Sequence, residues 1–146
     1  MFIPRILTFE CRGCPKEIRD QHCVSDGAFC FTPPSQEKVA NFPNITDQQL
    51  IEENLRERCI FELLAEQPGE SDDHLFFNYL FNVHLGCLQV ERELTKECAE
   101  KRMTHLGIDT ERVNFCINDS FDEKGDYTSY NELLEEDREN ANSLGI

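Results

Sequence analysis

Apolar residues recur at helical spacing through the middle of the chain. Thr46-Asp-Gln-Gln49 has the pattern of a capping box, and apolar side chains then return about every fourth residue as far as Gln67. Pro68 and Gly69 end this periodicity, and a second apolar stretch runs to about Leu85 from Ser71, which can cap it. Aromatic residues at helical spacing are typical of a core. The pattern therefore predicts two helices that pack on each other.

A pair of shorter helices is expected farther along. Thr95 can cap a helix that ends at Gly107, which can take a left-handed conformation, and Asp109 can cap the next one. Each of these helices carries one cysteine, Cys98 or Cys116. Those thiols are expected to tie this corner to the rest of the chain.

The two ends of the chain have different patterns. Residues 1–10 predict a strand, which needs partner strands from outside this chain, and residues 11–34 predict a cysteine-rich loop. Residues 44–120 form the expected disulfide-stapled helical segment, and residues 121–146 an acidic C-terminal extension with a helix near residues 131–140. The expected fold class is mainly α: a disulfide-rich helical segment with one N-terminal strand.

The charge balance excludes two classes of partner. The 146 residues include 29 acidic and 14 basic side chains, so the formal net charge is −15. Nucleic acids and anionic membranes both need a positive surface, and neither is expected as a partner. No apolar run approaches the roughly 20 residues that span a bilayer, and the N-terminus lacks an apolar signal core. We therefore expect a piece of a larger protein, or a processed product.

Eight cysteines indicate disulfides rather than a metal site. Neither they nor the four histidines have the spacing of zinc ligands, so we expect no metal and no cofactor. An even number of cysteines is typical of the secretory lumen or the extracellular space, and sequons at Asn44 and Asn118 support that compartment. The pairings that we favour are Cys23 with Cys30 across an Asp-Gly turn, Cys87 with Cys98 across a helix corner, and, by elimination, Cys59 with Cys116. Cys11 is left to pair with Cys14 or with a part of the protein outside this chain.

One motif has a possible redox role. Cys11-Arg-Gly-Cys14 follows the expected strand and precedes a polar stretch that could form a short helix, as in thioredoxin-type sites where a helix N-terminus lowers the pKa of a thiol. Such a site also needs a packed sheet behind it, and the chain offers a single strand. No other catalytic signature is present, so the chain is expected not to be an enzyme.

Several motifs together resemble the vacuolar sorting receptors, a family of type I membrane receptors. The resemblance covers roughly residues 1–120 and is most specific in its last third. The segments that carry it are Cys14-Pro15, the loop from Cys23 to Cys30, Glu53-Asn-Leu-Arg56 with Cys59, Phe76 to Cys87, Lys96-Glu-Cys-Ala99, Leu106-Gly-Ile-Asp109 and Cys116.

The resemblance implies part of the central luminal region of such a receptor. There a disulfide-laced helical segment is inserted in a thioredoxin-like domain, so this chain would hold an incomplete one, with residues 1–10 as an inner strand. The implied function is a non-enzymatic binding module that scaffolds recognition of soluble protein cargo. Its partners would be that cargo or other domains of the same receptor, and a membrane would be reached only through a segment absent from this chain. The alternatives are a thiol-disulfide oxidoreductase that uses Cys11 and Cys14, and a structural component of an extracellular assembly.

Overall fold

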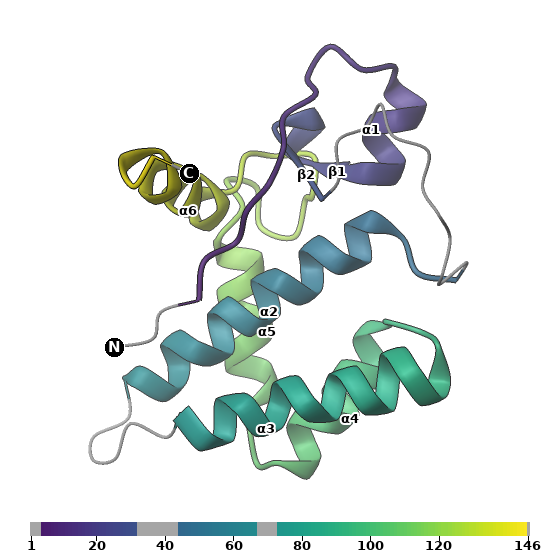
Figure 1. Cartoon of the computed structure of the whole chain (residues 1–146), viewed down its shortest axis with the longest axis vertical. Helices are drawn as coiled ribbons and strands as arrows, with labels where there is room; N and C mark the ends of the chain where they lie inside the picture. Colours follow the sequence, from purple (N-terminus) through teal and green to yellow (C-terminus); the bar gives the residue numbers. More distant parts are fainter. Residues whose placement is uncertain (1–3, 32–43, 67–72, 146) are drawn as a thin grey trace.

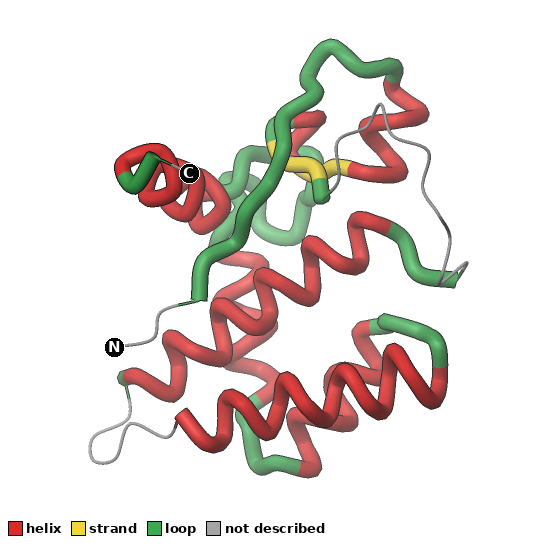
Figure 2. Tube along the Cα trace, viewed as in Figure 1, coloured by secondary structure: helices red, strands yellow, loops and turns green. Residues whose placement is uncertain are grey.

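The protein is a helical body with one small hairpin. The computed structural model describes residues 4–31, 44–66 and 73–145. Helix α2 crosses the middle of the molecule, with α3 and α4 on one side and the hairpin on the other (Figures 1 and 2). The elements are α1 (Lys16–His22), β1 (Cys23–Val24), the 3-10 turn η1 (Ser25–Gly27), β2 (Phe29–Cys30), α2 (Asp47–Ala65), α3 (Asp73–Val83), the π-helical segment η2 (His84–Glu91), α4 (Lys96–His105), α5 (Thr110–Asp119) and α6 (Glu132–Ser143).

Helix α2 begins at the predicted capping box. Thr46 Oγ1 accepts from the Gln49 backbone N–H at 3.1 Å, and the Thr46 N–H donates back to Gln49 Oε1 at 3.0 Å. Two of the four free N–H groups at the helix start are satisfied in this way. Ile51, Leu55 and Cys59 then recur on one buried face, each at most 1% exposed. The expected core face, with a sulfur in it, is confirmed.

Helices α4 and α5 also begin where local signals place them. Thr95 Oγ1 accepts from the Cys98 N–H at 3.1 Å, and Asp109 Oδ1 accepts from the Arg112 N–H at 3.2 Å. Gly107 lies between the helices with φ of 75°, a left-handed conformation that glycine adopts without steric cost. Short-range chemistry is sufficient to fix both helix starts.

The helix that precedes α4 differs from its prediction at both ends. The expected cap, Ser71, lies outside the described residues. At the other end the helix does not stop near Leu85 but widens into η2, which is followed by Arg92 with φ of 54°. The wider turns place Cys87 at the bridge to Cys98, and Cys87 is fully buried.

The N-terminal segment forms only a minimal ladder among residues 4–10. Phe9 and Cys30 make one antiparallel bridge, with backbone N···O distances of 2.8 and 2.7 Å. The two-stranded sheet lies instead in the region expected as a loop, where β1 and β2 pair Cys23 with Cys30. Gly27 closes that hairpin with φ of 93°, and a Cβ there would lie 2.6 Å from the Cys11 carbonyl oxygen. This turn accepts only glycine without displacing the backbone of Cys11.

The acidic C-terminal part packs onto the body rather than extending from it. Leu134 and Asp137 of α6 are both completely buried. Asp137 accepts from the Ile6 N–H at 2.9 Å and from Arg5 Nη1 at 3.0 Å, and it lies 3.5 Å from Arg58 Nε of α2. One carboxylate therefore joins the N-terminal segment, α2 and α6, three parts of the chain that are far apart in sequence.

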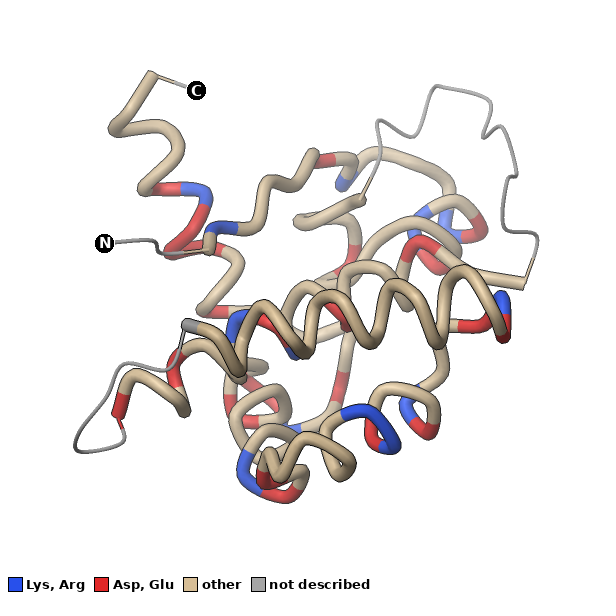
Figure 3. Tube along the Cα trace, turned by 60° about the horizontal axis from the view of Figure 1, so that its bottom comes forward, with Lys and Arg blue, Asp and Glu red and all other residues tan. Residues whose placement is uncertain are grey.

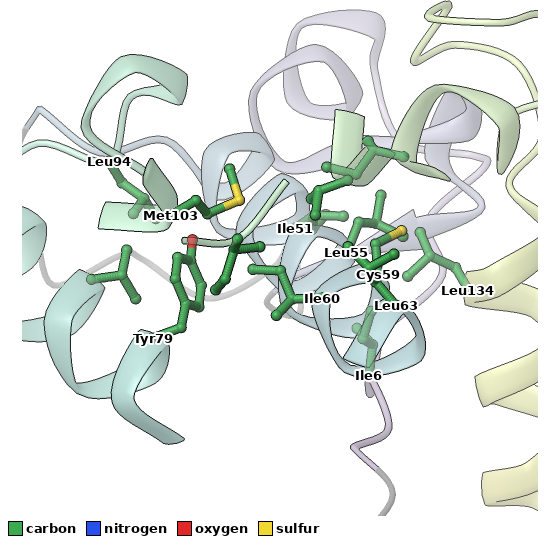
Figure 4. Close-up of a cluster of buried hydrophobic side chains, with 14 of the residues drawn as sticks. Ile6, Ile51, Leu55, Cys59, Ile60, Leu63, Tyr79, Leu94, Met103 and Leu134 are labelled. Atoms are coloured by element: carbon green, nitrogen blue, oxygen red, sulfur yellow. The ribbon is translucent and has the colours of Figure 1, made fainter. Parts of the chain in front are cut away.

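A continuous core links these elements. It extends from Tyr79, Leu94 and Met103 at one end to Ile6 and Leu134 at the other (Figure 4). Among the described helices, none combines the length and the apolar character that a bilayer crossing requires.

Candidate functional site: a disulfide frame and two grooves

Four disulfides frame the molecule. They join Cys11 to Cys14, Cys23 to Cys30, Cys59 to Cys116 and Cys87 to Cys98. These are the pairs that the sequence favours, with the open choice for Cys11 resolved to Cys14. The bridge from Cys59 to Cys116 joins α2 to α5 across a sequence separation of 57 residues, and the bridge from Cys87 to Cys98 joins η2 to α4.

The Cys11–Cys14 bridge lies at the surface. Both cysteines are half-buried, and the Cα atoms are 5.3 Å apart. Helix α1 starts after Pro15, but it has seven residues and none of them is buried. In the described part of the chain the adjacent sheet has two strands of two residues each. The local sequence resembles a redox motif, and the packed sheet that supports such a motif is not present in these ranges.

The two sequon asparagines lie at the surface. Asn44 and Asn118 are both exposed, as is Thr46 of the first sequon. Ser120 of the second sequon is buried, where its Oγ accepts from Asn131 Nδ2 at 2.8 Å. Both asparagines are therefore accessible positions for a glycan.

An open groove of about 750 Å³, which we call the α2–α5 groove, lies between α2, α5 and the start of α6. Its wall includes the Cys59–Cys116 bridge, Leu63 and the 62% exposed ring of Phe115. Six of its lining residues are acidic. Figure 3 shows how acidic positions are spread along the chain. The groove is lined by Cys59, Glu62, Leu63, Glu66, Glu111, Arg112, Phe115, Cys116, Asp119, Ser120, Glu132, Leu133 and Glu136.

A second groove of about 520 Å³, the α2–α3 groove, is more apolar. Phe31, Leu80 and Phe81 are among its lining residues. Glu57 also lines it and forms no hydrogen bond or ion pair with any described residue. Burial, with the nearby charge of Glu53 as a smaller contribution, raises the pKa of Glu57 to about 8. This carboxyl group is therefore mostly protonated at neutral pH.

Beneath the second groove lies a buried polar network. Tyr79 OH donates to Glu53 Oε1 at 2.7 Å, and Arg56 donates to the other oxygen of the same carboxylate. Burial raises the pKa of Glu53, and the charge of Arg56 opposes that shift. The network joins α2 to α3 through the two oxygens of the Glu53 carboxylate, while the buried Arg56 Nε has no hydrogen-bond partner among the described residues.

Neither groove could be predicted from the amino-acid sequence. The α2–α5 groove depends on how α6 packs, and the contacts that place α6 reach back to Arg5 and Ile6. In the sequence, the acidic residues of its lining have the pattern of an ordinary solvent-exposed helix face. Among the described residues, no group of three or more histidine, cysteine or acidic side chains is arranged to hold a metal ion.

Comparisons with known proteins found similarity along most of the chain. The family model described as the vacuolar sorting receptor thioredoxin-like domain matches residues 1–144. Vacuolar-sorting receptor 6 of Arabidopsis thaliana is 25% identical over 124 residues, which is 82% of this chain and 18% of that protein. Vacuolar-sorting receptor 1 of Pisum sativum is 26% identical over 121 residues, 81% of this chain and again 18% of the relative. The chain thus spans about a fifth of the length of these relatives.

Proposed function

Since the chain belongs to the vacuolar sorting receptor family, through its thioredoxin-like domain, we propose that it is a non-enzymatic binding module for soluble proteins. The match of the family model over residues 1–144 carries this proposal. Two open grooves on a disulfide-framed body support it, because concave surfaces with apolar lining are common sites of recognition.

The setting of this module is the secretory or endomembrane lumen, or the extracellular space. Four disulfides persist in such oxidising compartments and are rare where glutathione keeps thiols reduced. The proposed partners are soluble cargo proteins or other domains of the same receptor. Because the chain spans about a fifth of its relatives, cargo binding by the whole receptor is part of the proposal as well.

A binding experiment with two reporters tests the function. The chain is produced in an oxidising compartment, immobilised, and exposed to a secreted fluorescent protein with or without a vacuolar sorting propeptide. Retention of the propeptide-bearing reporter alone is the expected result. Equal retention of both reporters, or of neither, would contradict a cargo-binding role for this module.

The Cys11–Cys14 bridge favours a second candidate, a thiol-disulfide oxidoreductase. Both sulfurs belong to half-buried residues, and Arg12 is an exposed neighbour whose charge would stabilise a thiolate. Catalysis by the chain of insulin reduction with dithiothreitol as the electron donor, abolished in a Cys11→Ser/Cys14→Ser variant, would establish this activity. Insulin reduction at the uncatalysed rate, with Cys11 unreactive toward iodoacetamide at mildly acidic pH after the bridge has been reduced, would exclude it.

A further inference from the structure

The α2–α5 groove combines two kinds of surface that one ligand can satisfy together. Leu63, Leu133 and the exposed ring of Phe115 offer apolar contact, and acidic side chains stand around them. Its volume of about 750 Å³ falls within the roughly 300–1,000 Å³ of ordinary ligand sites. A ligand that buries an apolar side chain here also brings its own charges next to carboxylates.

Two of the lining carboxylates have no counter-charge among the described residues. Glu111 and Glu132 form no ion pair with any described residue. Glu62 and Glu136 pair with the buried Arg58 of α2. The pairs of the other two lining acids are long and solvent-exposed: Glu66 is 3.7 Å from Arg112, and Asp119 is 3.6 Å from a lysine outside the groove. Exposed pairs of this kind are weak and can exchange with a competing cation.

That lysine is Lys124, and its position beside Phe115 and Asp119 indicates where a cation of a ligand could bind. Its Nζ lies 5.4 Å from the centroid of the Phe115 ring while it pairs with Asp119. A cation over an aromatic face beside a carboxylate is a favourable arrangement. Because Lys124 is itself exposed, it competes with a basic side chain from outside for this position.

We infer that the α2–α5 groove binds a short basic segment of a soluble partner protein, with an apolar side chain against Leu63 and Phe115 and Arg or Lys side chains at the acidic rim. The inference rests on the proposed function and names the chemistry of the partner. Charge complementarity selects this occupant, because a phosphate-bearing ligand would be repelled by the same carboxylates. The segment needs an apolar side chain as well as basic ones, because exposed ion pairs alone give little affinity.

A synthetic peptide provides the test. The probe is a fluorescein-labelled peptide of alternating Leu and Arg, compared by fluorescence anisotropy with a Leu-Glu peptide and with a Gly-Arg peptide of equal length. We expect the intact chain to bind the Leu-Arg peptide at least about tenfold more tightly than either comparison. Binding should weaken as sodium chloride is raised, because salt screens the rim charges.

Matched variants locate the site. Glu111→Gln with Glu132→Gln should lower the affinity about fivefold, or about 1 kcal/mol, whereas Glu93→Gln with Glu97→Gln removes the same charge from exposed positions outside the groove and should have no effect. Lys124→Gln should raise the affinity two- to threefold, roughly the gain from removing one weak competing pair. A gain in affinity cannot result from partial unfolding.

Variants of two exposed phenylalanines, one in each groove, distinguish which groove binds the peptide. Phe115 is 62% exposed in the α2–α5 groove, and Phe81 is 65% exposed in the α2–α3 groove. Phe115→Ser should lower the affinity about tenfold and Phe81→Ser should leave it unchanged.

Several results would overturn the inference while leaving the proposed function intact. These are loss of binding in Phe81→Ser alone, equal losses in the two double glutamine variants, and failure of the peptide to bind a chain that still retains the propeptide-bearing reporter. Failure with both the peptide and the reporter would overturn the proposed function as well.

Discussion

Removing the Cys59–Cys116 bridge should cost more stability than removing any other disulfide of the chain. This bridge closes a separation of 57 residues, against 11 for Cys87–Cys98 and 7 for Cys23–Cys30. In the chain-entropy model these loops correspond to about 4.2, 2.8 and 2.3 kcal/mol. A typical domain has a net stability of about 5–15 kcal/mol, so the loss from the first bridge is a large share of it.

The ranking of the disulfides by stability contribution is unchanged although one bridge lies inside the loop that another closes. Cys87–Cys98 lies inside the loop that Cys59–Cys116 closes, so it shortens the unfolded path between the outer pair by its own 11 positions. Because the entropy varies only with the logarithm of loop length, this lowers the estimate by about 0.2 kcal/mol. Cys59 is also buried, so its replacement by alanine adds a small packing loss.

The measurement is urea unfolding followed by far-UV circular dichroism. The variant Cys59→Ala/Cys116→Ala is compared with Cys87→Ala/Cys98→Ala and with the unaltered chain, so that no unpaired thiol is introduced. The extrapolated free energy of unfolding should fall by about 4 kcal/mol in the first variant and by about 3 kcal/mol in the second. A loss below about 1 kcal/mol in the first variant, or a larger loss in the second, would refute the reasoning.

Three further predictions concern single side chains. Glu57→Gln should stabilise the chain at pH 8 and have little effect near pH 4.5. The carboxyl group has a pKa of about 8 in the folded chain and 4.5 in the unfolded chain, so the stability of the parent falls as pH rises between these values, by about 1–2 kcal/mol once solvent access is allowed for. A variant whose melting temperature keeps the parent's pH dependence would contradict this. Asp137→Asn should lower the free energy of unfolding in urea by about 3 kcal/mol, because the buried charge that accepts from Arg5 and from the Ile6 N–H is lost and Arg58 is left with its more exposed partners Glu62 and Glu136. The exposed Glu139→Gln on the same helix should change it little. Chain secreted from eukaryotic cells should lose mass on treatment with an N-glycosidase, and the loss should disappear when Asn44 and Asn118 are both replaced by glutamine; an unchanged mass in the parent would show both sequons to be unused.

Local chemistry accounts for what the sequence predicts correctly. The starts of α2, α4 and α5 depend on side chains within three residues of the helix terminus, such as Thr46, Thr95 and Asp109. The buried face of α2 follows from apolar spacing alone. The hairpin from Cys23 to Cys30 has the Asp-Gly turn midway, so both pairing and turn are encoded within a few residues.

Long-range polar contacts account for what the sequence does not predict. Arg56, Arg58 and Asp137 are buried, yet in a pattern of apolar and polar positions they count as surface. Each is buried because a partner from a distant segment or a neighbouring turn meets its charge, and nothing in the local sequence identifies that partner. The contacts of Asp137 also hold α6 against the body, so the α2–α5 groove could not be foreseen.

The bridge that contributes most to stability also forms part of the groove. Cys59 and Cys116 both line the α2–α5 groove, and their link fixes the distance between α2 and α5 with Cα atoms 5.9 Å apart. A ligand that contacts both helices gains affinity when their spacing is set before binding, because less ordering remains to be done on association. The stability of the fold and the proposed binding of a partner would therefore depend on the same covalent link. A chain that lacks it would bind the basic peptide more weakly even under conditions in which its helices remain formed.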